Sequence, residues 1–272
     1  MGNVFTRYID RLRGSGDAAI TLPPMDGALR PNNRIEEAEL LVSTEAPDNL
    51  VLHDGKVLFS SGSSLRCLTA DGQVEELDAT DSTIEFLTSH PSGALAIGLG
   101  AGRIEIRGGP HDGKRLSALG QTPIVAPSAA VFVDADTLLI CLASRQHAMG
   151  EWKRDLMTFG ATGSVMKIDL RTEEAICIAQ NLAFPSGVAL KPDGGILVSE
   201  SWKHRVLSIA EDGKITPVLD ELPGYPSRLV PGAGNDIWMC VFAPRTQLIE
   251  FVLRENEYRK RMIAEIDPEY WL

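Results

Sequence analysis

The residues with the clearest capacity for acid/base chemistry are one glutamate and two histidines in the middle of the chain. Glu200 ends a short apolar run, and His204 follows it by four residues, in a turn where the two side chains need not share a face. His147 lies in a long segment, residues 144–162, of the kind that often carries function. Carboxylates and imidazoles transfer protons in many enzymes, so these three side chains are candidates for catalysis or substrate binding. The alternatives are a solvated loop residue for His147 and an exposed turn residue for His204.

The sequence contains none of the common nucleophile and nucleotide motifs. It has no GxSxG elbow, P-loop or dinucleotide fingerprint. Its four cysteines include no CxxC pair, which argues against a zinc site. Each cysteine lies in an apolar strand-like run, so we expect buried free thiols, and three histidines beside turns are expected at the surface. The cysteines are Cys67, Cys141, Cys177 and Cys240, and the histidines are His53, His90 and His111.

Composition and charge argue against two classes of partner. The chain has 272 residues and a formal net charge of −11, whereas proteins that bind nucleic acid or anionic membranes need a basic face. Its N-terminus has no apolar core of the roughly 7–15 residues that a signal peptide needs. No apolar run approaches the roughly 20 residues of a membrane span. We therefore expect a cytoplasmic protein that binds neither nucleic acid nor membrane, and its oligomeric state stays open.

A repeating hairpin pattern predicts the fold. Short apolar runs alternate with turns beyond residue 37, and five of these turns are Asp-Gly dipeptides, which suit tight antiparallel hairpins. The hairpins recur about every 40 residues and a third strand follows each of them, which is typical of four-stranded propeller blades. We count about five blades and predict an all-β propeller. The paired runs are residues 49–52 with 56–60, 86–88 with 94–98, 130–133 with 137–141, 187–190 with 195–200, and 227–230 with 236–240.

The segments outside the hairpins complete the domain plan. Residues 1–36 are predicted to form a leader with a short helix, residues 37–254 the blades, and residues 255–272 a charged C-terminal helix. In the fifth blade, residues 248–253 are predicted to form the third strand. Residues 144–162 are longer than a turn, and we expect them to fold over one mouth of the propeller.

Several motifs resemble the strictosidine synthase-like family. They are the run FPSGVALKPDGGILVSE from Phe184 to Glu200, the short runs 205–207 and 222–226, and the segment 152–165. This family lies within a superfamily of six-bladed propellers that includes gluconolactonases, senescence marker proteins and paraoxonases. The resemblance therefore implies a sixth blade, of which the hairpin pattern contains no complete copy, so we expect either a shortened form of the chain or a residual sixth blade. Residues 37–43 could supply one strand that closes the ring and covers an otherwise open sheet edge.

The resemblance also implies a metal position in the central channel. Metal-dependent members hold a calcium-like ion with a glutamate, two asparagines and an aspartate, and such oxygen ligands suit a hard cation. The matching positions here are Glu45, Ser128, Ser186 and Ser227. Three of them are neutral hydroxyls, and Arg228 follows the last one. We therefore do not expect tight binding of a calcium-like divalent cation and assign no cofactor.

The resemblance suggests a reaction as well. Glu200 matches the essential glutamate of strictosidine synthase, which joins an amine to an aldehyde without a metal. It implies a metal-independent enzyme that acts on a small organic molecule in the central channel, with Glu200 as the acid/base group if burial raises its pKa. The alternative is that Glu200 only fixes Trp202, His204 or a neighbouring backbone amide.

Two other functions stay open. One is a metal-dependent lactone or ester hydrolase of the gluconolactonase type that uses Glu45, so the enzyme would be a lyase or a hydrolase. The other is a propeller that binds its ligand without catalysis, which the three serines favour. The candidate substrate-binding residues are Ser128, His147, Ser186, Trp202, His204, Ser227 and Arg228.

Overall fold

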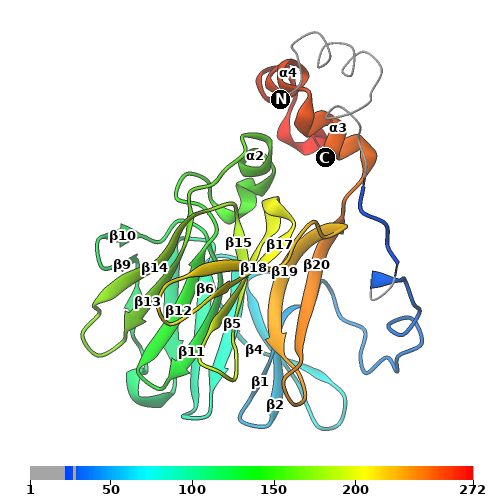
Figure 1. Cartoon of the computed structure of the whole chain (residues 1–272). Coiled ribbons are helices and arrows are strands. Elements are labelled where there is room, and N and C mark those ends of the chain that lie inside the picture. The colour runs from blue at the N-terminus through cyan, green and yellow to red at the C-terminus, as the bar shows by residue number, and fades with distance from the viewer. Residues whose placement is uncertain (1–21, 27–28, 272) are drawn as a thin grey trace.

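Antiparallel sheets arranged as blades around a common axis form the body of the protein (Figure 1). The computed structural model describes residues 22–26 and 29–271, so the expected N-terminal helix lies outside the described residues. Among the described residues, four sheets have four strands in sequence order, and two smaller sheets have two strands each. This confirms the predicted all-β propeller.

The strands of each blade follow one another along the chain. Blade 1 comprises β1 (Asp48–His53), β2 (Lys56–Ser61), β3 (Ser64–Leu68) and β4 (Val74–Ala79); blade 2 comprises β5 (Ile84–His90), β6 (Ala94–Leu99), β7 (Arg103–Arg107) and β8 (Arg115–Leu116). Blade 3 comprises β11 (Pro127–Asp134), β12 (Thr137–Leu142), β13 (Gly163–Asp169) and β14 (Ala175–Leu182); blade 4 comprises β15 (Pro185–Leu190), β16 (Ile196–Glu200), β17 (Arg205–Ile209) and β18 (Ile215–Leu219). Blade 5 comprises β19 (Gly224–Pro231) and β20 (Ile237–Pro244), and a small hairpin of β9 (Ala118–Leu119) and β10 (Thr122–Pro123) follows blade 2.

The hairpin turns and the apolar strands explain why these blades form. In the first hairpin, Asp54 and Gly55 both have positive φ, as a type I′ turn requires, so His53 pairs directly with Lys56. The second strands of blades 2 and 3 are deeply buried: every residue of β6 lies in the interior, and so does every residue of β12 except Thr137. The outer strand β18 is exposed along its whole length. The core therefore lies between neighbouring blades, where their inner strands pack face to face.

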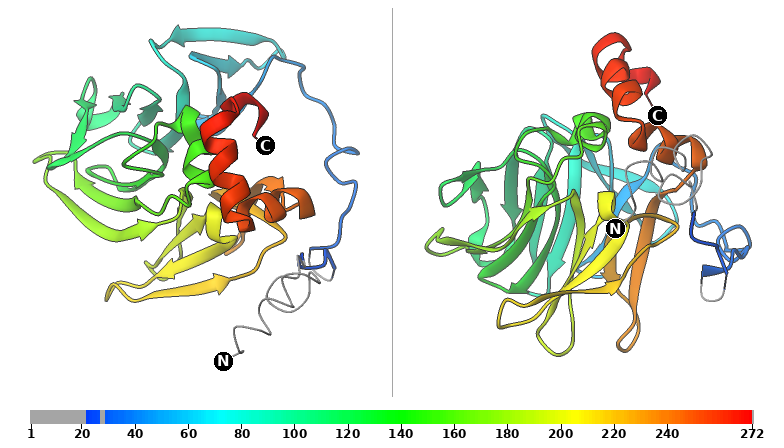
Figure 2. Two further views of the ribbon diagram at one scale, coloured as in Figure 1. Left: turned by 90° about the horizontal axis from the view of Figure 1, so that it is seen from above. Right: turned by 45° about the horizontal axis from the view of Figure 1, so that its top comes forward.

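The ring of blades is open between blade 5 and blade 1. The first strands of successive blades pack against one another from β1 to β19, but β19 and β1 have no comparable contact. Figure 2 shows this opening from above, with the described N-terminal segment running outside it. Residues 37–43 form no strand there, so the structure does not support the expected closing strand. Trp238 and Phe242 on β20 are consequently exposed, by 73% and 55%.

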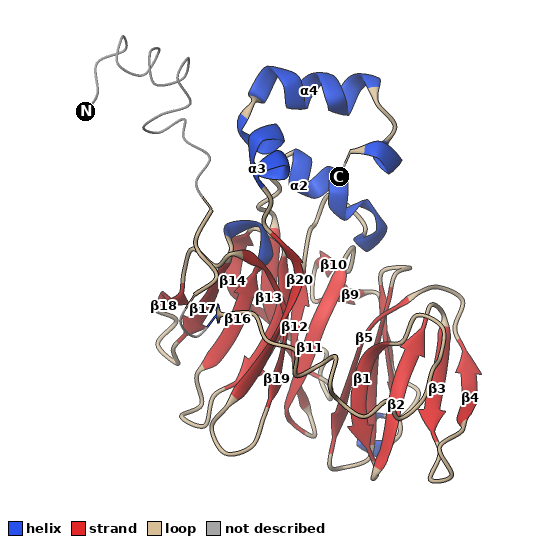
Figure 3. Cartoon of the chain, turned by 90° about the vertical axis from the view of Figure 1, so that its right-hand side faces the viewer, coloured by secondary structure: helices blue, strands red, loops and turns tan. Residues whose placement is uncertain are grey.

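Helices gather at one end of the propeller, above the strands (Figure 3). The helix α2 (Trp152–Met157) and the short helix η4 (Met149–Glu151) come from the segment 144–162, as expected for a cover over one mouth. The helices α3 (Gln247–Arg254), α4 (Asn256–Glu265) and η6 (Pro268–Tyr270) complete this group. The apolar cluster beneath them comprises Leu156, Met157, Tyr225, Val252, Leu253 and Trp271.

The helix α3 corrects the expected third strand of blade 5. Thr246 caps the helix, because its side-chain oxygen accepts a hydrogen bond from the Ile249 backbone N–H at 3.3 Å. Ile249, Val252 and Leu253 then share one face at helical spacing and pack into the apolar cluster under the cap. The strand predicted for residues 248–253 is therefore wrong, because an apolar run this short fits either a strand or a helix.

Two of the four cysteines also differ from expectation. All four are free thiols, but only Cys67 and Cys141 are buried. Cys177 lies on the outer strand β14 and Cys240 on β20, and both are exposed. An outer or unpaired strand presents alternate residues to solvent, which an apolar sequence run does not reveal.

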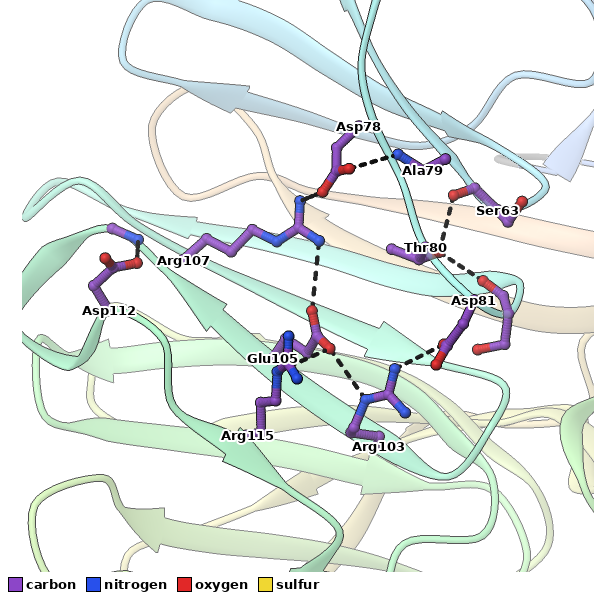
Figure 4. A network of polar contacts seen from close by, with 12 residues as sticks. Ser63, Asp78, Ala79, Thr80, Asp81, Arg103, Glu105, Arg107, Asp112 and Arg115 are labelled. Carbon is purple, nitrogen blue, oxygen red and sulfur yellow. Dashed lines mark hydrogen bonds and ion pairs between the residues drawn. The ribbon is translucent and has the colours of Figure 1, made fainter.

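Charged residues tie the outer parts of blades 1 and 2 together (Figure 4). The nearly buried carboxylate of Glu105 forms ion pairs with Arg103, Arg107 and Arg115 at 3.1–3.4 Å. Arg107 also pairs with Asp78 of β4 at 2.6 Å, and Arg103 pairs with Asp81 of the connecting segment at 2.7 Å. The arginines thus share their charge between the two blades. This network lies away from the residues that line the central cavity described below.

Gly187 sets the spacing between blades 4 and 5. A Cβ atom at this position would lie 2.2 Å from the backbone oxygen of Ser227 and 2.8 Å from the backbone nitrogen of Leu229. Strand β15 therefore approaches β19 backbone to backbone, beside the channel. The glycine of the motif Phe184-Pro185-Ser186-Gly187 is needed for this approach.

We predict that Gly187→Ala destabilises the protein by about 1–3 kcal/mol, because the methyl group must push apart two strands that cannot yield as a flexible side chain would. The free energy of unfolding in urea measures this. Gly150→Ala is the matched control, because nothing lies within 4 Å of a Cβ atom there, and it should change stability by less than about 0.5 kcal/mol. Equal stability of the two variants would contradict the assigned role of Gly187.

Candidate functional site

A cavity of about 190 Å³ lies at the centre of the ring, between the first strands of the blades and helix α2. Every blade contributes a residue from near the start of its first strand. These residues are Asp48 of β1, Glu85 of β5, Ser128 of β11, Ser186 of β15, and Ser227 and Arg228 of β19. The repeat therefore places equivalent positions of five different blades around one space, which is why residues far apart in sequence meet there.

Aromatic side chains form one wall of the cavity. Phe184 and Trp202 stack with their ring centroids 4.3 Å apart, and Trp152 meets Phe242 edge to face at 5.0 Å. The indole Nε1–H of Trp202 donates a hydrogen bond to the buried carboxylate of Asp155 at 2.9 Å, which fixes the orientation of the ring. Such a wall favours an apolar or ring-containing ligand.

Another part of the cavity lining is charged. Arg228 pairs with Asp48 through Nη1 and Oδ1 at 3.0 Å, and its Nη2–H donates to the side-chain oxygen of Asn49 and, at 3.0 Å, to the backbone oxygen of Glu85. The Glu85 carboxylate itself has no hydrogen bond or ion pair within the described residues. Gly100 leaves room for it, since a Cβ atom there would lie 2.8 Å from Oε1 of Glu85.

The environment of Glu85 changes its acidity. Burial raises the pKa of Glu85 above its ordinary value, although the positive charge of Arg228 opposes that rise. A carboxyl group of this kind exchanges a proton closer to neutral pH than a solvated one does. Glu85 is therefore the residue of the cavity best suited to acid/base chemistry, and it is not among the site residues predicted from the sequence.

The predicted serines do reach the cavity, but two of the three hydroxyls are committed to the protein. The Ser128 hydroxyl donates to the backbone oxygen of Pro185 at 2.6 Å, from blade 3 to blade 4. The Ser186 hydroxyl contacts that of Ser201 and lies 3.2 Å from the backbone oxygen of Pro226, from blade 4 to blade 5. These hydroxyls act as links between blades. Ser227 lines the cavity without such a link.

The residues present do not fit the calcium-like ion that the resemblance implies. Glu45 is exposed and does not line the cavity, contrary to its expected role as a ligand. Ser128 and Ser186 direct their hydroxyls to carbonyl groups, and the guanidinium of Arg228 brings a positive charge to this side of the channel. Among the described residues, no group of three or more His, Cys, Asp or Glu side chains could hold a metal ion.

Glu200 is buried beside the cavity rather than facing it. Its Oε2 pairs with Nε of Arg205 at 2.6 Å, and its Oε1 accepts a hydrogen bond from the Ala183 backbone N–H at 2.8 Å. These contacts match the alternative of a glutamate that fixes a backbone amide. The acid/base role of Glu200 stays a prediction, and it does not line the space where a ligand would lie.

The two candidate histidines also lie outside the lining of the cavity. The Nδ1 atom of His147 is 3.0 Å from Oδ2 of Asp155, so His147 supports the residue that holds Trp202. His204 packs against the ring of Tyr225 and has its Nε2 atom 3.7 Å from Glu250, under helix α3. Both side chains are largely buried. His147 is therefore not a solvated loop residue, and His204 is not an exposed turn residue.

The structure thus brings together five of the predicted site residues and adds others. Ser128, Ser186, Trp202, Ser227 and Arg228 line the cavity. The additions are Asp48, Glu85, Met149, Trp152, Phe184, Ser201 and Phe242. The signal for Asp48 and Glu85 was their equivalent place in the hairpin repeat, since each stands near the start of a first strand.

Comparisons with known proteins agree with these motifs. The family model for strictosidine synthase matches residues 129–209, which form most of blades 3 and 4. The chain resembles the strictosidine synthase family. Adipocyte plasma membrane-associated protein of Mus musculus is 26% identical over 285 aligned positions, which cover 90% of this chain and 66% of that protein. Strictosidine synthase-like protein 10 of Arabidopsis thaliana is 28% identical over 113 positions, which cover 40% of this chain and 30% of the relative.

Solved structures show the same fold. A gluconolactonase-like protein superposes with a TM-score of 0.55 at 15% identity, over 74% of this chain and 73% of that one. Regucalcin of Agrobacterium tumefaciens, a calcium-binding protein, gives a TM-score of 0.52 at 14% identity, over 74% and 69% of the two chains. The chain spans about two thirds of the length of the curated relatives it matches. None of the described helices has the length and apolar character needed to cross a membrane.

The burial of His204 predicts a pH effect on stability. Burial lowers the pKa of His204 to about 4, and the charge of Arg245 adds to this, while Glu250 opposes it. Between its ordinary pKa of about 6.5 and this lower value, the unfolded chain takes up a proton that the folded chain does not. The free energy of unfolding therefore falls as the pH decreases through this window.

We expect His204→Asn to weaken that fall, measured as the urea midpoint at a series of pH values. Asparagine accepts the positive φ of 52° at this position, and Glu250 keeps its bond to Arg245 at 2.9 Å. A ligand that binds the central cavity should bind this variant unchanged. The same pH slope in variant and parent would refute the assignment.

Proposed function

We propose that the protein is a strictosidine synthase-like propeller that acts, without a metal, on a small organic molecule in its central cavity. The observation that carries this proposal is the unpaired, half-buried Glu85 carboxyl group in the same cavity as the aromatic wall of Trp202 and Phe184. The cavity is smaller than the roughly 300–1,000 Å³ of pockets for drug-sized ligands, so its ligand is a compact compound.

The residues have separate parts in this proposal. The aromatic wall stacks on an apolar ring of the ligand, and Asp155 holds Trp202 in position for that contact. Glu85 exchanges a proton with the ligand, because its raised pKa lets it act as an acid and then as a base. Arg228 balances the charge of Asp48 on the same side of the cavity. Condensation of an amine with a carbonyl compound needs such proton transfers and no metal.

A second function, binding without catalysis, is favoured by a different observation. Two of the three serine hydroxyls are occupied by carbonyl groups of neighbouring blades, so they are not available as nucleophiles. A binding propeller would use the same wall and the same charged side. The residues around the cavity do not support hydrolysis of a lactone by a metal-activated water. The cytoplasmic location of the protein stays a prediction.

Two glutamate variants separate the roles of Glu85 and Glu200. A panel of arylalkylamines with aldehydes, lactones and aryl esters is screened by quenching of tryptophan fluorescence, since Trp152 and Trp202 line the cavity, and hits are assayed for turnover. We expect Glu85→Gln to lower kcat about 100-fold or more and to fold with about the stability of the parent, because Glu85 is half-buried and its carboxyl group has no hydrogen bond or ion pair to lose among the described residues.

Glu200→Gln is the matched comparison. We expect it to lower the free energy of unfolding by about 1–3 kcal/mol, because the buried Glu200 loses its charge while the partly exposed Arg205 keeps its own, and to keep kcat within a few-fold. Loss of turnover in a well-folded Glu200→Gln with full activity in Glu85→Gln would overturn the assignment of Glu85. A panel that binds but gives no turnover would support the binding function instead.

A further inference from the structure

Arg228 lies among oxygen atoms that come from a distant part of the chain. Its guanidinium contacts the carboxylate of Asp48, the side-chain oxygen of Asn49 and the backbone oxygen of Glu85. The first two belong to blade 1 and the third to blade 2, whereas Arg228 belongs to blade 5. The contacts therefore span the opening of the ring, where no sheet lies between blades 5 and 1 among the described residues.

The orientation of the Asn49 side chain is fixed by its own donors. Its Nδ2 group donates to the hydroxyl of Ser60 at 2.8 Å and to the backbone oxygen of Ile84 at 2.9 Å. The side-chain oxygen must then face Arg228. Asn49 is buried, with 4% of its surface exposed. Its side-chain oxygen is therefore held in a fixed position beside Arg228.

These acceptors are the kind that a hard divalent cation prefers. Calcium binds carboxylate, side-chain amide and backbone carbonyl oxygens, and one of each surrounds Arg228. The Glu85 carboxyl group, which also lines the cavity, would add a second carboxylate. A divalent ion and a guanidinium cannot share these oxygens, because the two positive charges would repel each other at contact distance.

We infer that Arg228 is the resident cation of the channel: its guanidinium takes the place of a divalent ion and joins blade 5 to blades 1 and 2 across the open side of the ring. Two consequences follow. The protein as it exists does not respond to calcium, and replacing Arg228 by a neutral oxygen-bearing side chain turns the same oxygens into a calcium site. This inference does not depend on catalytic activity.

Thermal unfolding of the full chain tests both consequences. The wild-type Tm should be unchanged by millimolar CaCl2 or by EDTA. Arg228→Asn should have a lower Tm, which CaCl2 restores with a rise that grows with the logarithm of its concentration. MgCl2 should do less, because magnesium demands a stricter octahedral geometry. Terbium luminescence sensitised by the cavity tryptophans should appear in Arg228→Asn and not in the wild type.

Two further variants control this experiment. Arg228→Asn combined with Asp48→Asn should lose the calcium response, because the carboxylate that faced the guanidinium is gone. Arg171→Asn removes an arginine that pairs with two other carboxylates, those of Asp169 and Asp136. Among the described residues, no side-chain amide or backbone carbonyl oxygen accepts a hydrogen bond from the Arg171 guanidinium. It should show no calcium response, and a response equal to that of Arg228→Asn would overturn the inference.

Arg228→Lys keeps the test decisive if Arg228→Asn does not fold. Lysine retains the charge but has one nitrogen instead of the forked guanidinium, so it cannot reach all three oxygens at once. We expect a variant that folds with a lower Tm than the wild type and does not respond to CaCl2. A Tm equal to that of the wild type, or a wild-type Tm raised by CaCl2, would show that Arg228 is not the resident cation.

Discussion

The contact of Arg228 with blades 1 and 2 is the interaction on which the central site depends. A propeller normally holds its first strands around the channel because each blade packs on two neighbours, but here blades 1 and 5 each lack one neighbour among the described residues. The apolar faces beside the opening are exposed, as Trp238 shows, so packing cannot set the distance across it. A charged and hydrogen-bonded contact does so instead, and it defines the charged side of the cavity.

The other side of the cavity is positioned by the helical cap. Asp155 on α2 holds Trp202 of blade 4, and His147 holds Asp155 from the other side. Trp152 of α2 meets Phe242 of β20. The cap thus joins the segment inserted in blade 3 to blades 4 and 5 by a buried carboxylate and aromatic contacts, which resist rearrangement because each polar atom has its partner. The two sides of the site are therefore built by different means.

The sequence allowed the fold to be predicted because hairpins are local. An Asp-Gly pair with positive φ values and two flanking apolar runs specify a hairpin wherever they occur, and the period then gives the blade. The fifth blade was predicted wrongly beyond β20 because a short apolar run does not distinguish a strand from a helix, and the decisive Thr246 cap is a single hydrogen bond. The residues of the site were harder to predict than the fold. Glu45 and Asp48 are only three positions apart, and the place where β1 begins decides which of them faces the channel.

Glu85 shows why side-chain environment could not be read from spacing. Arg228 contacts the backbone oxygen of Glu85 but the carboxylate of Asp48. The two acidic side chains of this cavity therefore have different environments. Asp48 has a direct cationic partner, whereas the Glu85 carboxyl group has burial without a paired charge, and burial raises its pKa. A single arginine therefore both joins the open ring and leaves one carboxyl group free for chemistry.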